Sequence, residues 1–283
     1  MTKLLSAGFS RLFKNRTFYI CAAVMAVSGA LNALTSTPRP EEYADHLDDI
    51  FFEYCSLIPI LMSVFCSMFI GTEYSDGTMR NKLITGHKRA AVYMSNFIIS
   101  AAAGLMMYAA CMLACLALGI PILGFFVGDI GMIFVRIGCS LTMLLALTGI
   151  FTLISLIVRS KTASAVVSIL LAFTLLLGAA ILYSLLLEPE YYHDYNIESV
   201  YTEGGEQIYV PSEESESVPN PFYVSGVKRQ IYQFIVDFTP GGQVIEILSG
   251  SMSSPFLLAG YSMLIAVGTT VAGLIVFSRK NLN

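Results

Sequence analysis

The chain has 283 residues, of which 55% are hydrophobic and 13% charged, and its mean hydropathy is +0.70. A soluble domain of this length would carry about a quarter charged residues, so the composition indicates an integral membrane protein. The net charge of −4 argues against nucleic acid as a partner. The sequence predicts an all-α polytopic membrane protein in which residues 1–283 form a single transmembrane domain.

The first 16 residues are predicted to form an amphipathic helix. Leu5, Phe9, Leu12 and Phe13 recur at helical spacing, and the basic and hydroxyl side chains fall largely elsewhere. Such a helix can lie along the cytoplasmic membrane face, at the interface with lipid. The same segment also fits an ordinary basic flank that orients the first span. It does not fit a secretory signal peptide, because a membrane-length apolar run follows it.

Six apolar stretches are long enough to cross a bilayer, which requires about 20 helical residues. The third stretch is too long for one straight span, and Pro121 with its neighbouring glycines predicts that the helix ends near residue 119. Pro59 falls inside the second span, where a kink can be tolerated. The predicted spans are residues 17–37, 54–72, 90–119, 137–158, 162–187 and 256–278.

The distribution of basic residues tests this count of spans. With both termini in the cytoplasm, all but four of the 16 Lys and Arg residues lie on the cytoplasmic side. The four exceptions are Arg39, Arg136, Lys228 and Arg229. This bias follows the positive-inside rule and predicts a multi-pass cell-membrane protein with both termini cytoplasmic.

A short polar segment, GTEYSDGTMRNKLITGHKRA (residues 71–90), separates the second and third spans. A helix could begin after Gly77, with Met79, Leu83 and Ile84 on one face and Gly86 at its end. Displayed in the cytoplasm, such a helix is suited to dock into a groove on a partner. The pattern alone favours a simpler interpretation, a positive-inside loop with a glycine turn.

The sequence offers little catalytic chemistry, and no catalytic, cofactor-binding or metal-binding residue is predicted. The six cysteines lie in or beside apolar runs and are interpreted as small apolar helix residues, although Cys111 and Cys115 share one helix face. There is no HExxH or GxSxG motif and no P-loop, so ATP hydrolysis by that route is excluded. The spans lack ionisable residues, which argues against an ion-coupled carrier.

Residues 188–255 form an acidic, tyrosine-rich insert that is predicted to lie outside the cell. SVYTEGGEQIYVP (199–211) predicts a β-hairpin around Gly204 and Gly205, and PSEESESVPNP (211–221) is interpreted as a flexible linker. Two short amphipathic helices are then predicted at the outer membrane surface, separated at TPGG (239–242). They could cap a transport pathway or merely seal the bundle. The apolar stripe of the first helix comprises Ile231, Phe234, Ile235 and Phe238.

The segment EYSDGTMRNKL (residues 73–83), followed by GHKR (86–89) and a new span, resembles the E-x-x-x-G-T-x-R-N loop of ABC-2-type ABC transporter permeases. NPFYVSG (220–226) and PGGQ (240–243) also resemble the outer segment of some bacterial members. In that family, the loop between spans 2 and 3 holds the coupling helix that contacts the ATPase subunit. The resemblance covers most of the chain, and the size and acidity of residues 188–255 depart from it.

The resemblance implies roles for individual residues of the loop. Arg80 and Lys82 are expected to meet acidic groups of the ATPase, whereas Lys88 and Arg89 are expected to meet phospholipid. Glu73 is expected to pair either with Arg80 or with the N-terminal helix. The ATPase-coupling residues that the resemblance implies are Glu73, Gly77, Thr78, Arg80, Asn81 and Lys82.

The resemblance also implies partners and a location. The chain would be a permease subunit in a bacterial plasma membrane, without enzymatic activity or cofactor, energised by a separate ABC ATPase subunit. It would pair with a second, identical or related permease, and small residues in span 5 (163–165 and 178–180) suggest a dimer face. An apolar pathway would suit export of a hydrophobic or peptide-like substrate.

Two other functions remain open on the sequence. The first is a non-transporting membrane sensor or immunity protein that binds a ligand through residues 188–255. The second is a membrane enzyme, which the lack of a catalytic constellation disfavours.

Overall fold

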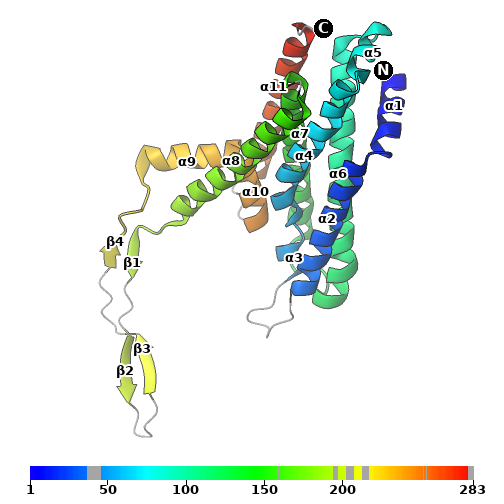
Figure 1. Ribbon diagram of the computed structural model, residues 1–283. Coiled ribbons are helices and arrows are strands. Elements are labelled where there is room, and N and C mark those ends of the chain that lie inside the picture. The colour runs from blue at the N-terminus through cyan, green and yellow to red at the C-terminus, as the bar shows by residue number, and fades with distance from the viewer. Residues whose placement is uncertain are drawn as a thin grey trace.

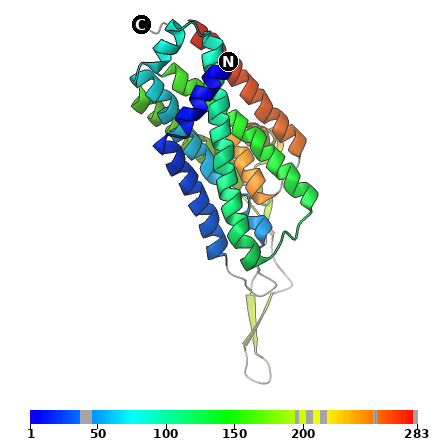
Figure 2. The same cartoon turned by 90° about the vertical axis from the view of Figure 1, so that its right-hand side faces the viewer.

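The structure is a helical bundle (Figures 1 and 2). It is a computed structural model that describes residues 1–36, 46–158, 160–193, 197–201, 207–211, 217–250, 252 and 254–279. Within these residues, six helices are long and apolar enough to cross a membrane. They are α2 (Arg16–Thr35), α4 (Tyr54–Ser75), α6 (Arg89–Leu123), α7 (Ile130–Ile157), α8 (Lys161–Leu187) and α11 (Pro255–Arg279). The prediction of an all-α polytopic membrane protein is confirmed.

Two helix boundaries differ from those expected. α6 continues past residue 119 to Leu123, because Pro121 lies in its last turns and a proline there removes only one backbone hydrogen bond. α7 begins at Ile130 rather than at residue 137, because the Asp129 carboxylate accepts a hydrogen bond from the Gly131 backbone N–H at 3.0 Å and caps an earlier first turn. Arg136 therefore lies inside α7 and not in a loop.

Two short helices lie at the end of the bundle that carries both termini (Figures 1 and 2). α1 (Thr2–Leu12) packs against α6, and α5 (Thr78–Ile84) follows α4. The helix ends are tied together there, because the Tyr74 hydroxyl in α4 donates to the Leu156 carbonyl in α7 at 2.7 Å. Arg89 in α6 likewise donates to the Phe277 carbonyl in α11 at 3.2 Å, a protein contact where lipid was expected. We call this the termini end of the bundle.

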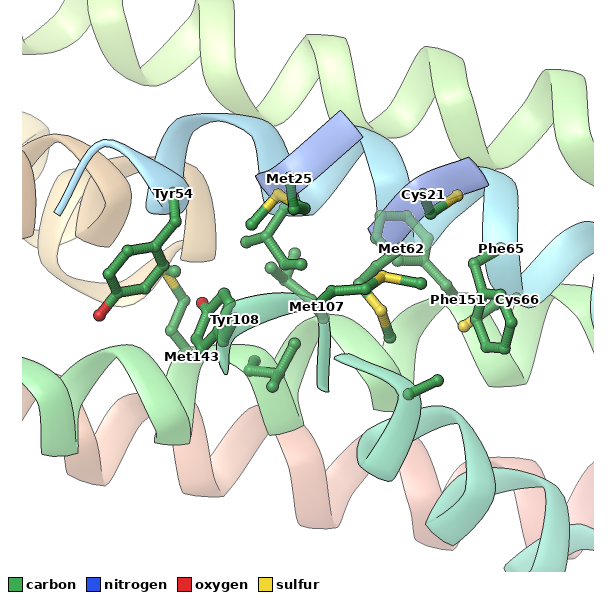
Figure 3. Packing of buried hydrophobic residues seen from close by; sticks show 14 of the residues in the cluster. Cys21, Met25, Tyr54, Met62, Phe65, Cys66, Met107, Tyr108, Met143 and Phe151 are labelled. Carbon is green, nitrogen blue, oxygen red and sulfur yellow. The ribbon is translucent and has the colours of Figure 1, made fainter. Parts of the chain in front are cut away.

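The core lies between α2, α4, α6 and α7, where methionine and aromatic side chains interdigitate (Figure 3). At one end of this cluster, the Tyr54 and Tyr108 rings meet edge to face with centroids 4.5 Å apart. The Tyr54 hydroxyl lies 3.0 Å from the Ser140 hydroxyl, and Tyr108 donates to the Ser140 carbonyl. All six cysteines are buried, free thiols in helices, as the sequence predicted. Apolar packing and internally paired hydroxyls together account for a stable bundle in lipid.

The insert after α8 contains four short strands in two antiparallel pairs. β2 (Ile197–Tyr201) pairs with β3 (Gln207–Pro211), which confirms the predicted hairpin strands, whereas the expected turn glycines lie outside the described residues. β1 (Tyr191–His193) pairs with β4 (Ser217–Pro219). The linker assigned to residues 211–221 is therefore wrong at its end, because Ser217–Pro219 forms a strand. The strands extend away from the helices as a narrow ribbon (Figure 1).

Two helices follow the ribbon, α9 (Gly226–Phe238) and α10 (Pro240–Ser249), with the predicted break at Thr239 between them. α10 does not rest on an outer surface. Its residues from Pro240 to Val244 are buried, and it contacts α4, α7 and α8. A Cβ at Gly241 would overlap the carbonyl oxygen of Leu175, near the middle of α8, so α10 approaches that helix backbone to backbone. α10 is therefore part of the bundle interior.

Candidate functional site

The segment between α4 and α6 forms two sharp turns around one short helix. Gly77 has φ +68 and ψ +5, a left-handed conformation that a residue with a Cβ adopts only at a cost. This residue ends α4 and starts α5 in another direction. The α5 helix buries Met79 and partly buries Leu83, so its inner face packs on the bundle. The sequence-predicted helix is therefore present, with its start and end at the predicted glycines.

The side chain of Glu73, in the last turn of α4, lies at the centre of the site. Its Oε1 is ion-paired with the Arg11 guanidinium of α1 and with the Lys82 ammonium of α5. Its Oε2 accepts a hydrogen bond from the Asn96 amide of α6 at 3.2 Å. The Thr78 hydroxyl donates to the Glu73 carbonyl at 3.2 Å. One carboxylate thus joins four helices, α1, α4, α5 and α6.

Burial makes this junction sensitive to change. Glu73 is 1% exposed, whereas the Arg11 and Lys82 side chains are 30% and 21% exposed. Arg11 also stacks on the Phe69 ring, with its guanidinium carbon 3.7 Å from the ring centroid. Burial lowers the pKa of Arg11, and the Glu73 charge opposes that shift. Removing the carboxylate would leave two cations close together and partly desolvated, which is strongly destabilising for a buried pair.

The structure distributes the sequence-predicted residues between two layers. Glu73 and Lys82 meet in the buried junction, exposed Thr78 donates a hydrogen bond to the Glu73 carbonyl, and Gly77 makes the turn. Arg80 and Asn81 are exposed on α5 and do not touch the junction. The expected alternatives for Glu73 are thereby resolved, since its partner is Arg11 of the N-terminal helix and not Arg80.

Sequence reasoning missed Arg11, Phe69 and Asn96 as members of the site. A usable signal exists for Arg11, because Leu4, Gly8 and Arg11 follow one another at helical spacing on one face of α1. For Asn96, the signal is a strongly polar amide near the start of an apolar span. Neither signal names Glu73 as the partner.

The outer face of α5 is open to a partner. Arg80, Asn81 and the neighbouring Thr78 are exposed, and Ile84 is 71% exposed one turn after Arg80. A protruding helix with a cation beside an apolar side chain can lie in a groove of another protein. Among the described residues, no group of three or more His, Cys, Asp and Glu side chains is placed to hold a metal ion. The exposed face of α5 therefore suits contact with a partner.

Comparison with protein-family models gives one finding for this chain. A model described as ABC-2 family transporter protein matches residues 4–179, more than half of the sequence. The matched region contains most of α1, the junction around Glu73, α5 and most of the long helices. A comparison with curated proteins finds no match.

Proposed function

The chain belongs to the ABC-2 family of transporter proteins, and on that premise we propose that it is the permease subunit of an exporter driven by a separate ABC ATPase. A permease subunit forms the membrane-spanning part of such a transporter, and the six apolar helices agree with that part. The proposed substrate is hydrophobic or peptide-like, because the side chains buried in the bundle are mainly apolar or hydroxyl-bearing. The proposed direction is export from a bacterial cytoplasm across the plasma membrane.

The observation that carries the proposal is the attachment of α5 to its neighbours through Glu73. A force on the exposed face of α5 would reach α4 through Gly77 and the Lys82 ion pair. It would reach α1 through Arg11 and α6 through Asn96. Rigid connections of this kind let a small displacement at one end move packed helices as units. We propose that ATPase closure supplies this displacement, with Arg80 and Asn81 at the contact.

We infer the orientation of the chain in the membrane from its charge. The termini end carries the basic side chains of α1, α5 and the start of α6, and basic residues remain on the cytoplasmic side during membrane insertion. In this proposed orientation, α5 lies on the side of the membrane where a cytoplasmic ATPase would bind.

We also propose a second permease subunit, because six helices are too few to enclose a complete transport pathway. α8 turns an apolar row outward, and a Cβ at Gly178 would meet no atom within 4 Å. Gly178 lies roughly a quarter turn from that row, and Ser164 and Ala179, which the sequence also suggested for a dimer face, are buried within this chain. The exposed apolar residues on this side of α8 are Val166, Leu170, Phe173, Leu177 and Ile181.

The experiment is a purification of the tagged chain from its native membrane, followed by identification of bound proteins and an ATPase assay. The wild type should retain an ABC ATPase whose activity responds to the permease. Arg80→Ala with Asn81→Ala should lose the ATPase without loss of folded protein, because both side chains are exposed. Lys14→Ala, an exposed basic residue at the same end, is the matched control. If the double variant retained as much ATPase as the wild type, α5 would not be the contact with the ATPase.

The alternative function, a ligand sensor that uses residues 188–255, makes the reverse prediction. Deleting residues 190–227 would abolish function, whereas Gly77→Pro would leave it intact. The observation that favours this alternative is the strand ribbon, which extends away from the helices (Figure 1). Loss of function on Gly77→Pro in a folded protein would exclude it.

A further inference from the structure

A second polar cluster lies between α9 and α10, away from the termini end. The Gln233 amide donates to Asp237 Oδ1 at 2.7 Å within α9. The same amide donates to Glu246 Oε1 of α10 at 3.3 Å. One amide group thus holds two carboxyl groups near each other across the two helices.

Among the residues that the structure describes, no cation forms an ion pair with either carboxyl group. Glu246 is 2% exposed, and its Oε2 has no hydrogen-bond partner there. Arg136 of α7 approaches α10 but donates to the carbonyls of Ile247 and Leu248 at the end of that helix. The described Lys, Arg and His side chains form no ion pair with Asp237 or Glu246. A buried carboxyl oxygen that has neither a hydrogen-bond partner nor a paired cation is an incomplete polar site.

Burial and the neighbouring Asp237 raise the pKa of Glu246 to about 8. Glu246 is therefore mainly protonated at neutral pH and can donate a hydrogen bond to Asp237. The pair then carries one negative charge, which lies on Asp237. Asp237 is half-buried, so this charge can be reached from outside the bundle.

Asp237 faces a surface hollow of about 400 Å³ lined by Arg229, Gln230, Gln233, Phe234 and Asp237. The Phe234 ring is 51% exposed and stacks on Phe238, with centroids 5.5 Å apart. Tyr261 of α11 meets both rings at their edges, which fixes their orientation. An aromatic face beside a carboxylate is the combination that binds organic cations, through ring electrostatics and a charge-assisted hydrogen bond.

Arg229 lies at the other end of the hollow, two helical turns before Asp237. Its guanidinium donates to the carbonyls of Leu186 and Val224, at 2.9 Å and 3.4 Å, and lies over the Tyr223 ring. These contacts keep the Arg229 charge directed toward the end of α8. The Asp237 end of the hollow remains the negative end.

We propose that Asp237 and Phe234 form a binding site for an organic ammonium ion, with Glu246 as a positioning residue that donates a hydrogen bond to Asp237. Exposed Ile231 and Ile235 flank Phe234 and would take the apolar part of an amphipathic amine. A divalent metal ion fits less well, because it needs several more oxygen ligands than this pair supplies. The site is independent of ATPase coupling, since it lies on α9 and α10.

The test uses the full-length chain in nonionic detergent and the water-soluble probe 2-phenylethylammonium. The neutral analogue 2-phenylethanol is the matched ligand control. Calorimetric titration should detect binding of the ammonium ion and not of the alcohol. Asp237→Asn should weaken binding about tenfold or more, as expected for loss of a charged hydrogen-bond partner. Phe234→Leu should weaken it about threefold through loss of the aromatic face.

Two further variants separate charge from structure. Glu246→Gln keeps a neutral donor and should retain binding at neutral pH. Asp76→Asn removes an exposed carboxylate at the termini end and should have no effect. Unchanged affinity in Asp237→Asn, or equal binding of the alcohol, would overturn the proposal.

A second measurement needs no variant. Carbodiimide labelling of Asp237, followed by peptide mass spectrometry, should be suppressed by 2-phenylethylammonium and not by 2-phenylethanol. Equal labelling with and without the ammonium ion would show that the probe does not occupy this hollow.

Discussion

Glu73 and Glu246 are buried to nearly the same extent, 1% and 2% exposed, yet their surroundings differ in charge. Glu73 meets Arg11 and Lys82, whereas Glu246 meets Asp237. In both sites a side-chain amide, Asn96 or Gln233, donates to the buried carboxyl group. The difference shows how a protein in lipid uses a buried acid. A buried carboxylate that is paired with two cations, as at Glu73, becomes a structural junction. A buried carboxyl group beside a second carboxylate, as at Glu246, stays protonated, and the two carboxyl groups together can still accept a cation.

The largest effect is expected from Glu73→Ala. This change leaves Arg11 and Lys82 close together without a counter-charge, and we expect a loss of about 3 kcal/mol in stability, the low end for a broken buried pair because both partners are partly exposed. The melting temperature in detergent measures it. Asp76→Ala, an exposed acid three residues later, is the control and should change stability little. Equal effects of the two changes would show that burial at residue 73 is unimportant.

Gly77→Ala tests whether the left-handed turn that positions Lys82 in the junction contributes to stability. A Cβ at Gly77 meets nothing within 4 Å, so the penalty is conformational and should be about 1–2 kcal/mol. Gly138→Ala in α7 is the matched control, because a Cβ there also meets nothing within 4 Å. In a helix, that change should stabilise by about 0.5–1 kcal/mol. Changes of the same sign in the two variants would contradict the left-handed turn.

Asn96→Ala and Gln233→Ala compare the two amides directly. Asn96→Ala should cost about 1 kcal/mol, since Glu73 keeps both cations. Gln233→Ala should cost no more than this in stability, but it removes the group that holds Asp237 beside Glu246. It should therefore weaken binding of 2-phenylethylammonium, which Asn96→Ala should leave unchanged. Calorimetric titration of both variants provides the check.

Glu246→Gln should change the way in which stability depends on pH more than it changes the stability itself. Because the pKa of Glu246 is raised from 4.5 to about 8, the folded state binds the extra proton between these values. The resulting stability is fully present below pH 4.5 and is lost as the pH rises through 8. The wild type should therefore lose melting temperature as the pH rises from about 4.5 to about 8, and Glu246→Gln should lose less over the same range. If the melting temperatures of the two proteins changed in parallel with pH, the pKa of Glu246 would not be raised.

Much of the fold could be predicted because it depends on short segments. The apolar runs identify all six long helices, and Gly77 and Gly86 bracket α5 as expected. The boundary of α7 could not be found by counting charges, because Arg136 is accommodated over the Phe52 ring and against the α10 carbonyls. A distant element thus makes a charged residue acceptable within a helix.

The apolar stripe of α9 illustrates the same limit. Ile231, Phe234 and Ile235 were correctly placed on one face, but the structure leaves that face exposed. Val236 and the start of α10 are buried instead. Periodicity shows that a helix has two faces, and it does not show which face meets protein, lipid or a second subunit.

The sequence by itself determined that this protein crosses a membrane with six helices, and it located the short helix between the second and third. These properties follow from segment length, hydrophobicity and turn residues, which act over a few neighbouring positions. Only the tertiary structure decided that Glu73 joins Arg11, Lys82 and Asn96, and that α10 enters the bundle beside α8. Those contacts join residues far apart along the chain, so their energies depend on how whole helices pack.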